Sequence, residues 1–338
     1  MRGEIVTATP SFLERAASLL RAGELVAFPT ETVYGLGADA GNPDAVRHIF
    51  AAKGRPADHP VIVHLSTGDD MARWARTVPA PARALAAAFW PGPLTLIVPR
   101  AAHVSDLITG GQDGVGLRVP SHPVAAALLA AHARAGGTGI AAPSANRFGR
   151  ISPTTAAHVA ADLGSAVALI VDGGACTVGI ESTIVAFVGD EPVLLRPGGI
   201  GIAALTRVLG HAPRAADASA PRASGTLASH YAPRTPARLV FPEALTTVVV
   251  EAMQQQRSVG VLARSATRPH EFRGTWIAAA RDPEPYAHDL YAHLRTLDAA
   301  NAGAILIESP PLDDGWLAVN DRLARATHAT AQGDEDID

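Results

Sequence analysis

Apolar residues in the first two thirds of the chain occur in short runs that are separated by longer, alanine-rich stretches. Near the start, residues 11–22 place Phe12, Ala16, Leu19 and Leu20 on one stripe at helical spacing. The serine that opens this segment is followed three residues later by a glutamate, which is the spacing of a capping box. The segment is therefore predicted to form a surface helix.

Further short apolar runs have the length and the flanking turn residues of buried strands. They lie at residues 25–28, 61–65, 94–98, 115–119, 140–142, 168–171 and 182–187. Because these runs alternate with helical stretches, the pattern predicts an α/β sheet packed against helices.

Residues 210–236 are rich in Ala, Pro, Ser and Arg and lack apolar periodicity, which is typical of a linker or an ordered loop. Beyond this segment, four strand-like runs alternate with helical stretches, and in one of these Tyr286, Leu290, Leu294 and Leu297 recur at helical spacing. We therefore expect a first domain over residues 1–209, a linker over 210–236, a smaller strand-helix-strand domain over 237–330 and a frayed acidic tail over 331–338.

Length and charge narrow the class of protein. A chain of 338 residues favours two domains, and 28 Lys and Arg against 32 Asp and Glu indicate no bulk attraction to nucleic acid or to an anionic membrane. Cys176 is the only cysteine, which excludes an internal disulfide and a multi-cysteine metal site, and we interpret it as a packing residue. No apolar run approaches ~18 residues and the start lacks the pattern of a signal peptide, so we expect a cytoplasmic location.

Familiar catalytic signatures are absent from the sequence. It contains neither the P-loop pattern nor the glycine pattern of dinucleotide-binding domains. The main support for a P-loop protein and for a dinucleotide-binding protein is therefore missing. Metalloprotease and serine-elbow motifs are also missing. The chemistry must therefore come from other polar residues.

Polar clusters stand at the ends of the predicted strands. Residues 28–40 place two threonines around Glu31, and they could cup a small polar ligand or form an ordinary strand-to-helix turn. Lys53 and Arg55 suit an oligophosphate, although such a turn can equally be a solvated loop. His64 follows an apolar run and could bind a ligand or be a hydrogen-bonded core histidine.

The later clusters leave similar alternatives open. Arg118 lies within an apolar strand, where it needs the carboxylate of the protein or of a ligand as partner. Ser144, Asn146 and Ser152 lie on a loop expected to enter a helix, where they could help to bind phosphate or serve as plain caps. Downstream, Ser182 starts a strand, and Arg196 precedes a glycine turn in LLRPGG.

Taken together, the order and wording of these motifs resemble the YrdC/Sua5 family. The motifs are PTETVYGLG, KGRP, FWPGPLTL, VGLRVP, APSAN with SPT, and GIESTIV with LRPGG, spread over residues 11–205. SHYAP and VNDRLARA are similar to the C-terminal domain of the longer Sua5 branch. The resemblance implies an α/β fold with a YrdC-like open, twisted mixed sheet and helices, plus a smaller Rossmann-like α/β C-terminal domain.

The resemblance also implies an activity, the synthesis of threonylcarbamoyl-AMP from L-threonine, bicarbonate and ATP by a nucleotidyltransferase. Threonine's amine would add to CO₂, and the carbamate would attack the α-phosphorus of ATP and expel pyrophosphate. Alignment and charge neutralisation by Arg, Lys and the Mg²⁺ that accompanies ATP would suffice, so no side-chain nucleophile is needed. The product would pass to a threonylcarbamoyl transferase machinery for the tRNA modification N6-threonylcarbamoyladenosine.

Site residues carried over by position form two sets, with Lys53 and Arg55 as the catalytic pair. Around threonine we expect Thr32, His64, Arg118, Ser182 and the backbone of Ala142. Around ATP we expect Arg55, His59, Gly114, Ser144, Asn146, Ser152, Arg196, His230 and Tyr231, with the linker lying across the cavity.

Three departures from the family pattern stand out: His59 replaces the usual Asn, residues 223–226 read ASGT where SPGM is usual, and Gly114 lacks the hydroxyl of many relatives. Two rival functions remain. A YrdC fold can be an RNA-binding module without catalysis, with weak RNA binding and a steep salt dependence. The related domain of hydrogenase maturation makes carbamoyl-adenylate, but it comes with further segments that this sequence lacks.

Overall fold

The computed structural model describes residues 3–217 and 220–333 and divides into two compact units. Unit 1 comprises residues 1–148 and 152–226, and unit 2 comprises residues 149–151 and 227–338. The division after residue 226 falls inside the segment 210–236 that was expected to link two domains. No helix among the described residues is both long and apolar enough to cross a membrane.

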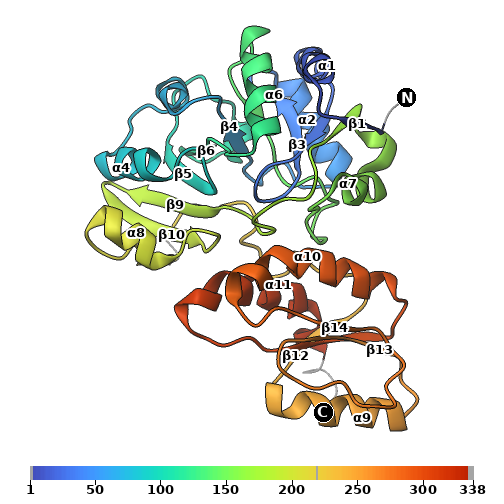
Figure 1. Cartoon of the computed structure of the whole chain (residues 1–338). Coiled ribbons are helices and arrows are strands. Elements are labelled where there is room, and N and C mark those ends of the chain that lie inside the picture. Colours follow the sequence, from blue (N-terminus) through green and yellow to red (C-terminus); the bar gives the residue numbers. More distant parts are fainter. Residues whose placement is uncertain (1–2, 218–219, 334–338) are drawn as a thin grey trace. The chain divides into compact units, whose positions relative to one another are not determined.

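A mixed sheet forms the centre of unit 1 (Figure 1). Over the described residues it has eleven strands in the order β1-β8-β2-β3-β7-β4-β6-β5-β9-β10-β11. The bounds are β1 Glu4–Thr7, β2 Val26–Phe28, β3 Gly35–Asp39, β4 Ile62–His64, β5 Leu94–Pro99, β6 Gly114–Arg118, β7 Ile140–Ala141, β8 Leu169–Asp172, β9 Thr183–Val188, β10 Glu191–Arg196 and β11 Arg214–Ala215. The predicted mixed α/β sheet is confirmed.

Helices cover both faces of this sheet. They are α1 Pro10–Arg21, α2 Pro43–Lys53, α3 Met71–Trp74, α4 Ala80–Phe89, α5 Asp106–Thr109, α6 Pro123–Arg134, α7 Ala156–Leu163 and α8 Ile202–Leu209. The alternation along β2 shows why two cores exist, since Val26 and Phe28 pack with α1 and α6, whereas Ala27 packs in the core that contains α2 and α4. Successive side chains of a strand point to opposite faces of its sheet.

The first helix begins one residue earlier than predicted and has a different N-cap residue. It begins at Pro10, and the Thr9 hydroxyl, not that of Ser11, accepts the cap hydrogen bond from the Phe12 N–H at 3.4 Å. The buried stripe is Leu13, Ala16, Ala17 and Leu20, which follows the spacing i, i+3, i+4, i+7 of a helix face.

Two motif loops also differ from expectation. The segment after β2 leads to a strand and not to a helix, because residues 26–28 pair antiparallel with residues 35–37. Gly37 permits this close pairing, since a Cβ there would lie 2.9 Å from the Phe28 ring and 3.0 Å from Ile140. Helix α7 starts only after Thr155, so Ser144 and Asn146 lie in a long loop and not at a helix start.

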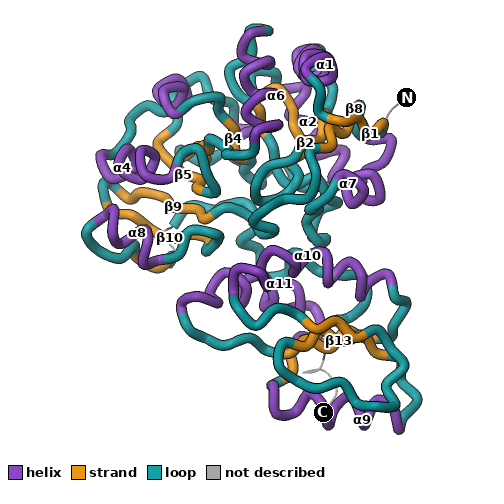
Figure 2. Tube along the Cα trace, viewed as in Figure 1, coloured by secondary structure: helices purple, strands orange, loops and turns teal. Residues whose placement is uncertain are grey.

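Unit 2 is a smaller, parallel α/β structure, shown with its helices in purple and strands in orange in Figure 2. Its described elements are β12 Ala237–Val240, α9 Pro242–Gln254, β13 Val259–Ala263, β14 Trp276–Ala278, α10 Pro283–Ala299, β15 Ala304–Glu308 and α11 Leu317–Gly333, with the strand order β12-β15-β13-β14. The stripe predicted on α10 is confirmed, because Tyr286, Leu290, Leu294 and Leu297 are all buried. Helix α11 extends into the expected acidic tail, and residues 334–338 lie outside the described part.

Candidate active site

The ends of two parallel strands bring the first predicted pair together. Strands β4 and β6 are in register, with His64 beside Arg118 at their carboxyl ends. His64 is 3% exposed. Burial and, secondarily, the Arg118 charge lower the pKa of His64 to about 3, so the ring is neutral at physiological pH.

Arg118 has a protein carboxylate as its partner. Its Nη2 donates to Glu31 Oε1 at 2.6 Å, and the Ser121 N–H donates to Glu31 Oε2 at 3.1 Å. Both ionised side chains are nearly buried, at 5% and 6% exposure. The alternative that the sequence left open is thus decided: Arg118 is charge-balanced before any ligand arrives.

The loop that carries Glu31 is ordered by its threonines. The Thr30 and Thr32 hydroxyls lie 2.8 Å apart, and the Thr30 hydroxyl also accepts the Val33 N–H. Ala142, the other residue expected near threonine, is buried, and its N–H donates to the Ile62 carbonyl at 2.9 Å. A ligand contact to the Ala142 backbone would therefore use its carbonyl oxygen.

Lys53 joins the KGR turn, which is residues 53–55, to the loop of residues 144–148, which we call the serine-asparagine loop. It ends α2, and its Nζ donates to the carbonyls of Ser144 at 2.6 Å and Asn146 at 2.5 Å. Burial and the neighbouring Arg55 charge lower the pKa of Lys53 well below its ordinary value. This brings Lys53, Ser144 and Asn146 to one place, as predicted, but with the ammonium group already donating to backbone.

Arg55 and Arg196 meet on a single linker residue, Ser224. Arg55 Nη2 donates to the Pro60 carbonyl at 2.9 Å and lies 3.4 Å from Ser224 Oγ. Arg196 Nη1 donates to the Ser224 carbonyl at 2.7 Å. The two cations predicted to bind ATP are therefore neighbours, and the segment 221–226, which we call the linker strap, lies between them.

Ser182 and Ser152 are both hydrogen-bonded inside the unit. Arg196 donates to the Ser182 carbonyl at 2.9 Å, and the Ser182 hydroxyl lies 2.8 Å from Thr95 Oγ1. Ser152 Oγ donates to Glu181 Oε1 at 2.5 Å. Ser182 thus lies beside the nucleotide cations as well as in the set expected around threonine.

His59 contacts an aromatic residue that sequence reasoning did not select. Its ring lies 5.4 Å from that of Phe148 in an edge arrangement, and the Arg55 guanidinium lies over the same Phe148 ring at 5.7 Å. Burial and the Arg55 charge lower the pKa of His59. His59, Arg55 and Phe148 therefore form one stack at the KGR turn.

Gly114 begins β6 beside a small cavity. A Cβ at this position would lie 2.8 Å from the Ile97 side chain, so Ile97 would have to move to admit any side chain. The cavity, about 20 Å³ in volume, is lined by Gly114 and by Ser224 of the linker strap, among others. A space of this size admits about one water molecule.

His230 and Tyr231 belong to unit 2 and not to the unit that holds the other site residues. The Tyr231 ring packs 5.6 Å from that of Tyr291, and the Arg322 guanidinium lies 5.4 Å from its centre. Their predicted contact with ATP therefore stays a prediction.

Carboxylates were the principal omission of the sequence reasoning. Glu31 was noticed but given no role, and Glu181 was not selected, although each lies next to a predicted ligand-binding residue in its motif. The signal was available, since a cation within an apolar strand requires a buried anion. Phe148 gave no such signal, because only the fold brings it to Arg55.

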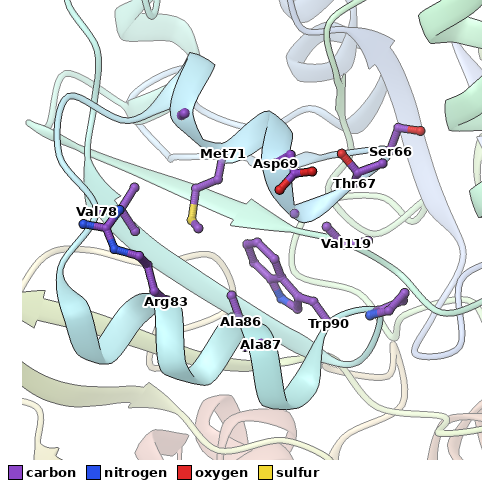
Figure 3. Close-up of a pocket in the computed structure, with 13 residues that line it drawn as sticks. Ser66, Thr67, Asp69, Met71, Val78, Arg83, Ala86, Ala87, Trp90 and Val119 are labelled. Carbon is purple, nitrogen blue, oxygen red and sulfur yellow. The ribbon is translucent and has the colours of Figure 1, made fainter.

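A second, larger cavity of about 600 Å³ lies between α3 and α4 (Figure 3). Its apolar lining includes Met71 and Trp90, and Asp69 and Arg83 stand at its edge. None of the predicted site residues lines this cavity, although Val119 directly follows Arg118. The candidate site is therefore the cationic cluster at the strand ends and not this cavity.

The fold and site define a class of two-unit α/β proteins with a buried cationic site at the strand ends of the first unit. The Sua5/YciO/YrdC family model, described as telomere recombination, matches residues 18–198. The model of the threonylcarbamoyl-AMP synthase C-terminal domain matches residues 200–328. The chain belongs to the Sua5/YciO/YrdC family, which confirms the predicted membership.

Relatives match along nearly the whole chain. A threonylcarbamoyl-AMP synthase of Bacillus subtilis is 40% identical over 96% of this chain and 94% of its own length. A synthase of the same name from Pyrococcus abyssi is 38% identical over 92% of this chain and 93% of its own length. The crystal structure of P. abyssi Sua5 complexed with L-threonine superimposes with a TM-score of 0.88 at 35% identity, covering 96% of this chain and 97% of that one.

Proposed function

We propose that this chain is a threonylcarbamoyl-AMP synthase, an enzyme that uses L-threonine, bicarbonate and ATP and releases pyrophosphate. The observation that carries the proposal is that Arg55 and Arg196 both donate hydrogen bonds to the same residue, Ser224. Two neighbouring cations suit the phosphates of ATP. The matching relatives named for this activity support it along both units.

The arrangement suits a reaction between two anions. Arg118, balanced by Glu31, and the neutral His64 would receive threonine, together with Thr32, Ala142 and Ser182. Arg55, Arg196 and the serine-asparagine loop, which Lys53 contacts, would hold the triphosphate close by. Holding a carbamate and a phosphate in line among fixed cations lowers a barrier that consists largely of charge repulsion and alignment.

The linker strap must move before ATP can bind in this way. The Ser224 carbonyl accepts a hydrogen bond from Arg196, and the Ser224 hydroxyl lies 3.4 Å from Arg55 Nη2, so this residue takes hydrogen bonds that phosphate oxygens would otherwise accept. We infer that the strap alternates between this position and one over the bound substrates, where it would shield the labile carbamate from water.

Mg²⁺ is proposed to arrive as part of the ATP substrate. In nucleotide enzymes this ion is usually held by phosphate oxygens and one or two carboxylates. The buried carboxylates of the site, Glu31 and Glu181, already accept hydrogen bonds from Arg118 and Ser152. Transfer of the product to a tRNA-modifying transferase and a cytoplasmic location remain predictions from the sequence.

The test is pyrophosphate release from ATP, with threonine or bicarbonate omitted in turn. We expect release to require both, and ATP turnover that is indifferent to threonine would refute the proposal. Arg55→Ala should lose most of the activity, at least about a hundredfold, because a phosphate-binding cation is removed. The matched control is Arg76→Ala, since Arg76 is exposed and pairs with Asp113 at the surface at 2.7 Å.

The same samples separate the rival function. A pure RNA-binding module would retain RNA, with affinity falling steeply as salt rises, and would release no pyrophosphate.

A further inference from the structure

The proposed reaction does not by itself explain why Arg55, His59 and Phe148 form a stack. Phe148 lies at the end of the serine-asparagine loop, and its N–H donates to the Lys53 carbonyl at 2.9 Å. Its half-buried ring lies under the Arg55 guanidinium at 5.7 Å and against the His59 ring at 5.4 Å. One side chain thus connects the loop that carries Asn146 with the turn that carries both Arg55 and His59.

Each of these contacts restricts a group that needs a defined direction. A guanidinium within about 6 Å of a ring centre is attracted to the ring face by the ring's quadrupole. An edge contact between rings similarly favours one orientation of the imidazole. Arg55 keeps a further tie to the Pro60 carbonyl, so ring and carbonyl together fix the plane of its fork.

The stack also bears on the protonation state of His59. His59 lies beside the Arg55 cation, which lowers the pKa of the imidazole after the larger effect of burial. A neutral ring packed on Phe148 can stand next to a guanidinium without charge repulsion.

We propose that Phe148 is a positioning residue for the nucleotide side of the site, acting through Arg55 and His59 and not by touching the phosphates. It rests on the proposed function, because it assumes that these two residues bind ATP. The phenyl ring holds the guanidinium fork and the imidazole at the angle at which they meet ATP. Threonine is expected at His64 and Arg118, at the ends of β4 and β6, and its binding does not depend on this ring.

The test is a comparison of Phe148→Leu with Phe148→Tyr. Leucine keeps apolar bulk but has no ring, whereas tyrosine keeps the ring face. We expect Phe148→Leu to raise the KM for ATP about fivefold to tenfold with the KM for threonine changed less than twofold, and Phe148→Tyr to stay within twofold of the wild type for both. Unchanged KM for ATP in Phe148→Leu, or an equal rise of both KM values, would overturn the proposal.

A double-variant cycle with His59→Asn checks that Phe148 acts through its neighbours. If it does, Phe148→Leu should raise the KM for ATP by a smaller factor in the His59→Asn background than in the wild type. Equal factors in both backgrounds count against the role of His59. The wild type is assayed first, so that absent threonine-dependent pyrophosphate release would refute the proposed function, whereas an active wild type with an unaffected Phe148→Leu would refute this inference alone.

Discussion

His64 is a buried histidine that is held neutral. Its pKa is about 3 in the folded chain, lowered from 6.5 by burial and then by the Arg118 charge. Between these two pH values the unfolded chain binds one proton more than the folded chain at this residue. The contribution of His64 to stability is therefore complete above pH 6.5 and is lost progressively as the pH falls toward 3.

We expect denaturant unfolding to show this dependence. Between pH 7 and pH 5 the wild type should lose about 2 kcal/mol through His64 alone, since each unit of pKa difference corresponds to about 1.4 kcal/mol. His64→Gln should lose correspondingly less over the same interval. His211→Gln serves as the control because His211 is exposed. An identical pH dependence in wild type and His64→Gln would contradict the assignment.

The Phe148 prediction also belongs at the residue scale, because it depends on ring chemistry at one position. Sequence reasoning reached His59 and Arg55 through a motif, but not the residue that orients them. A phenylalanine among polar residues has no pattern that points to its partners. Its role follows only from the return of residues 144–148 to the end of α2.

At the scale of elements, the Glu31–Arg118 pair connects the loop after β2 to the end of β6. Glu31 also accepts the Ser121 N–H, and its own carbonyl accepts the Val178 N–H at 2.7 Å. Three segments that are far apart in sequence therefore meet at one residue, Glu31. Removing the carboxylate would leave a nearly buried guanidinium without its charge partner.

Glu31→Gln is expected to lower the free energy of unfolding by roughly 3 kcal/mol, the usual cost of breaking a buried ion pair from one side. Urea unfolding followed by circular dichroism measures this. The double variant Glu31→Gln with Arg118→Met should recover part of the loss, because it removes the unpaired charge. A loss below about 1 kcal/mol, or no recovery in the double variant, would show that the pair is not important for stability.

At the scale of the whole molecule, each unit has its own hydrophobic core and its own sheet. In unit 2 the carboxylate of Glu308, fully buried at the end of β15, accepts the N–H groups of Arg264 at 2.7 Å, Ser265 at 2.9 Å and Ala266 at 3.0 Å. Consecutive N–H groups directed at one anion form a nest. Burial raises the pKa of Glu308, but a hydrogen bond from the Ser265 hydroxyl and these N–H groups outweigh it, so the pKa is lowered.

Glu308→Ala should therefore destabilise unit 2 selectively, by roughly 2 to 4 kcal/mol, through three unpaired N–H groups and a lost charge. Hydrogen exchange by mass spectrometry should show faster exchange in residues 237–308 and unchanged exchange in strands β2 to β6. Acetate matches the atoms removed and should slow this exchange again, whereas chloride at equal ionic strength should not. Faster exchange in both units would refute this independence.

Many of the helices and strands could be predicted from the local sequence, because the apolar patterns of strands and helices repeat every two to four residues. The seven apolar runs, the stripe on α10 and the change of composition over residues 210–236 are of this kind. The motifs also gave the cations, hydroxyls and amides that we predict to bind the substrates. Local spacing placed the cap of α1 at Ser11 wrongly, since Thr9 and Ser11 are both able to cap and only packing selects the helix face.

Tertiary structure decided the partners of those residues. Arg118 could have waited for a ligand, but 87 positions separate it from Glu31, and only the sheet brings them together. The same holds for Ser224, which reaches Arg55 over a separation of 169 positions, and for the turn after β2, which became a strand by pairing. Charge balance, burial and strand pairing depend on contacts between distant segments, and no local pattern of residues contains that information.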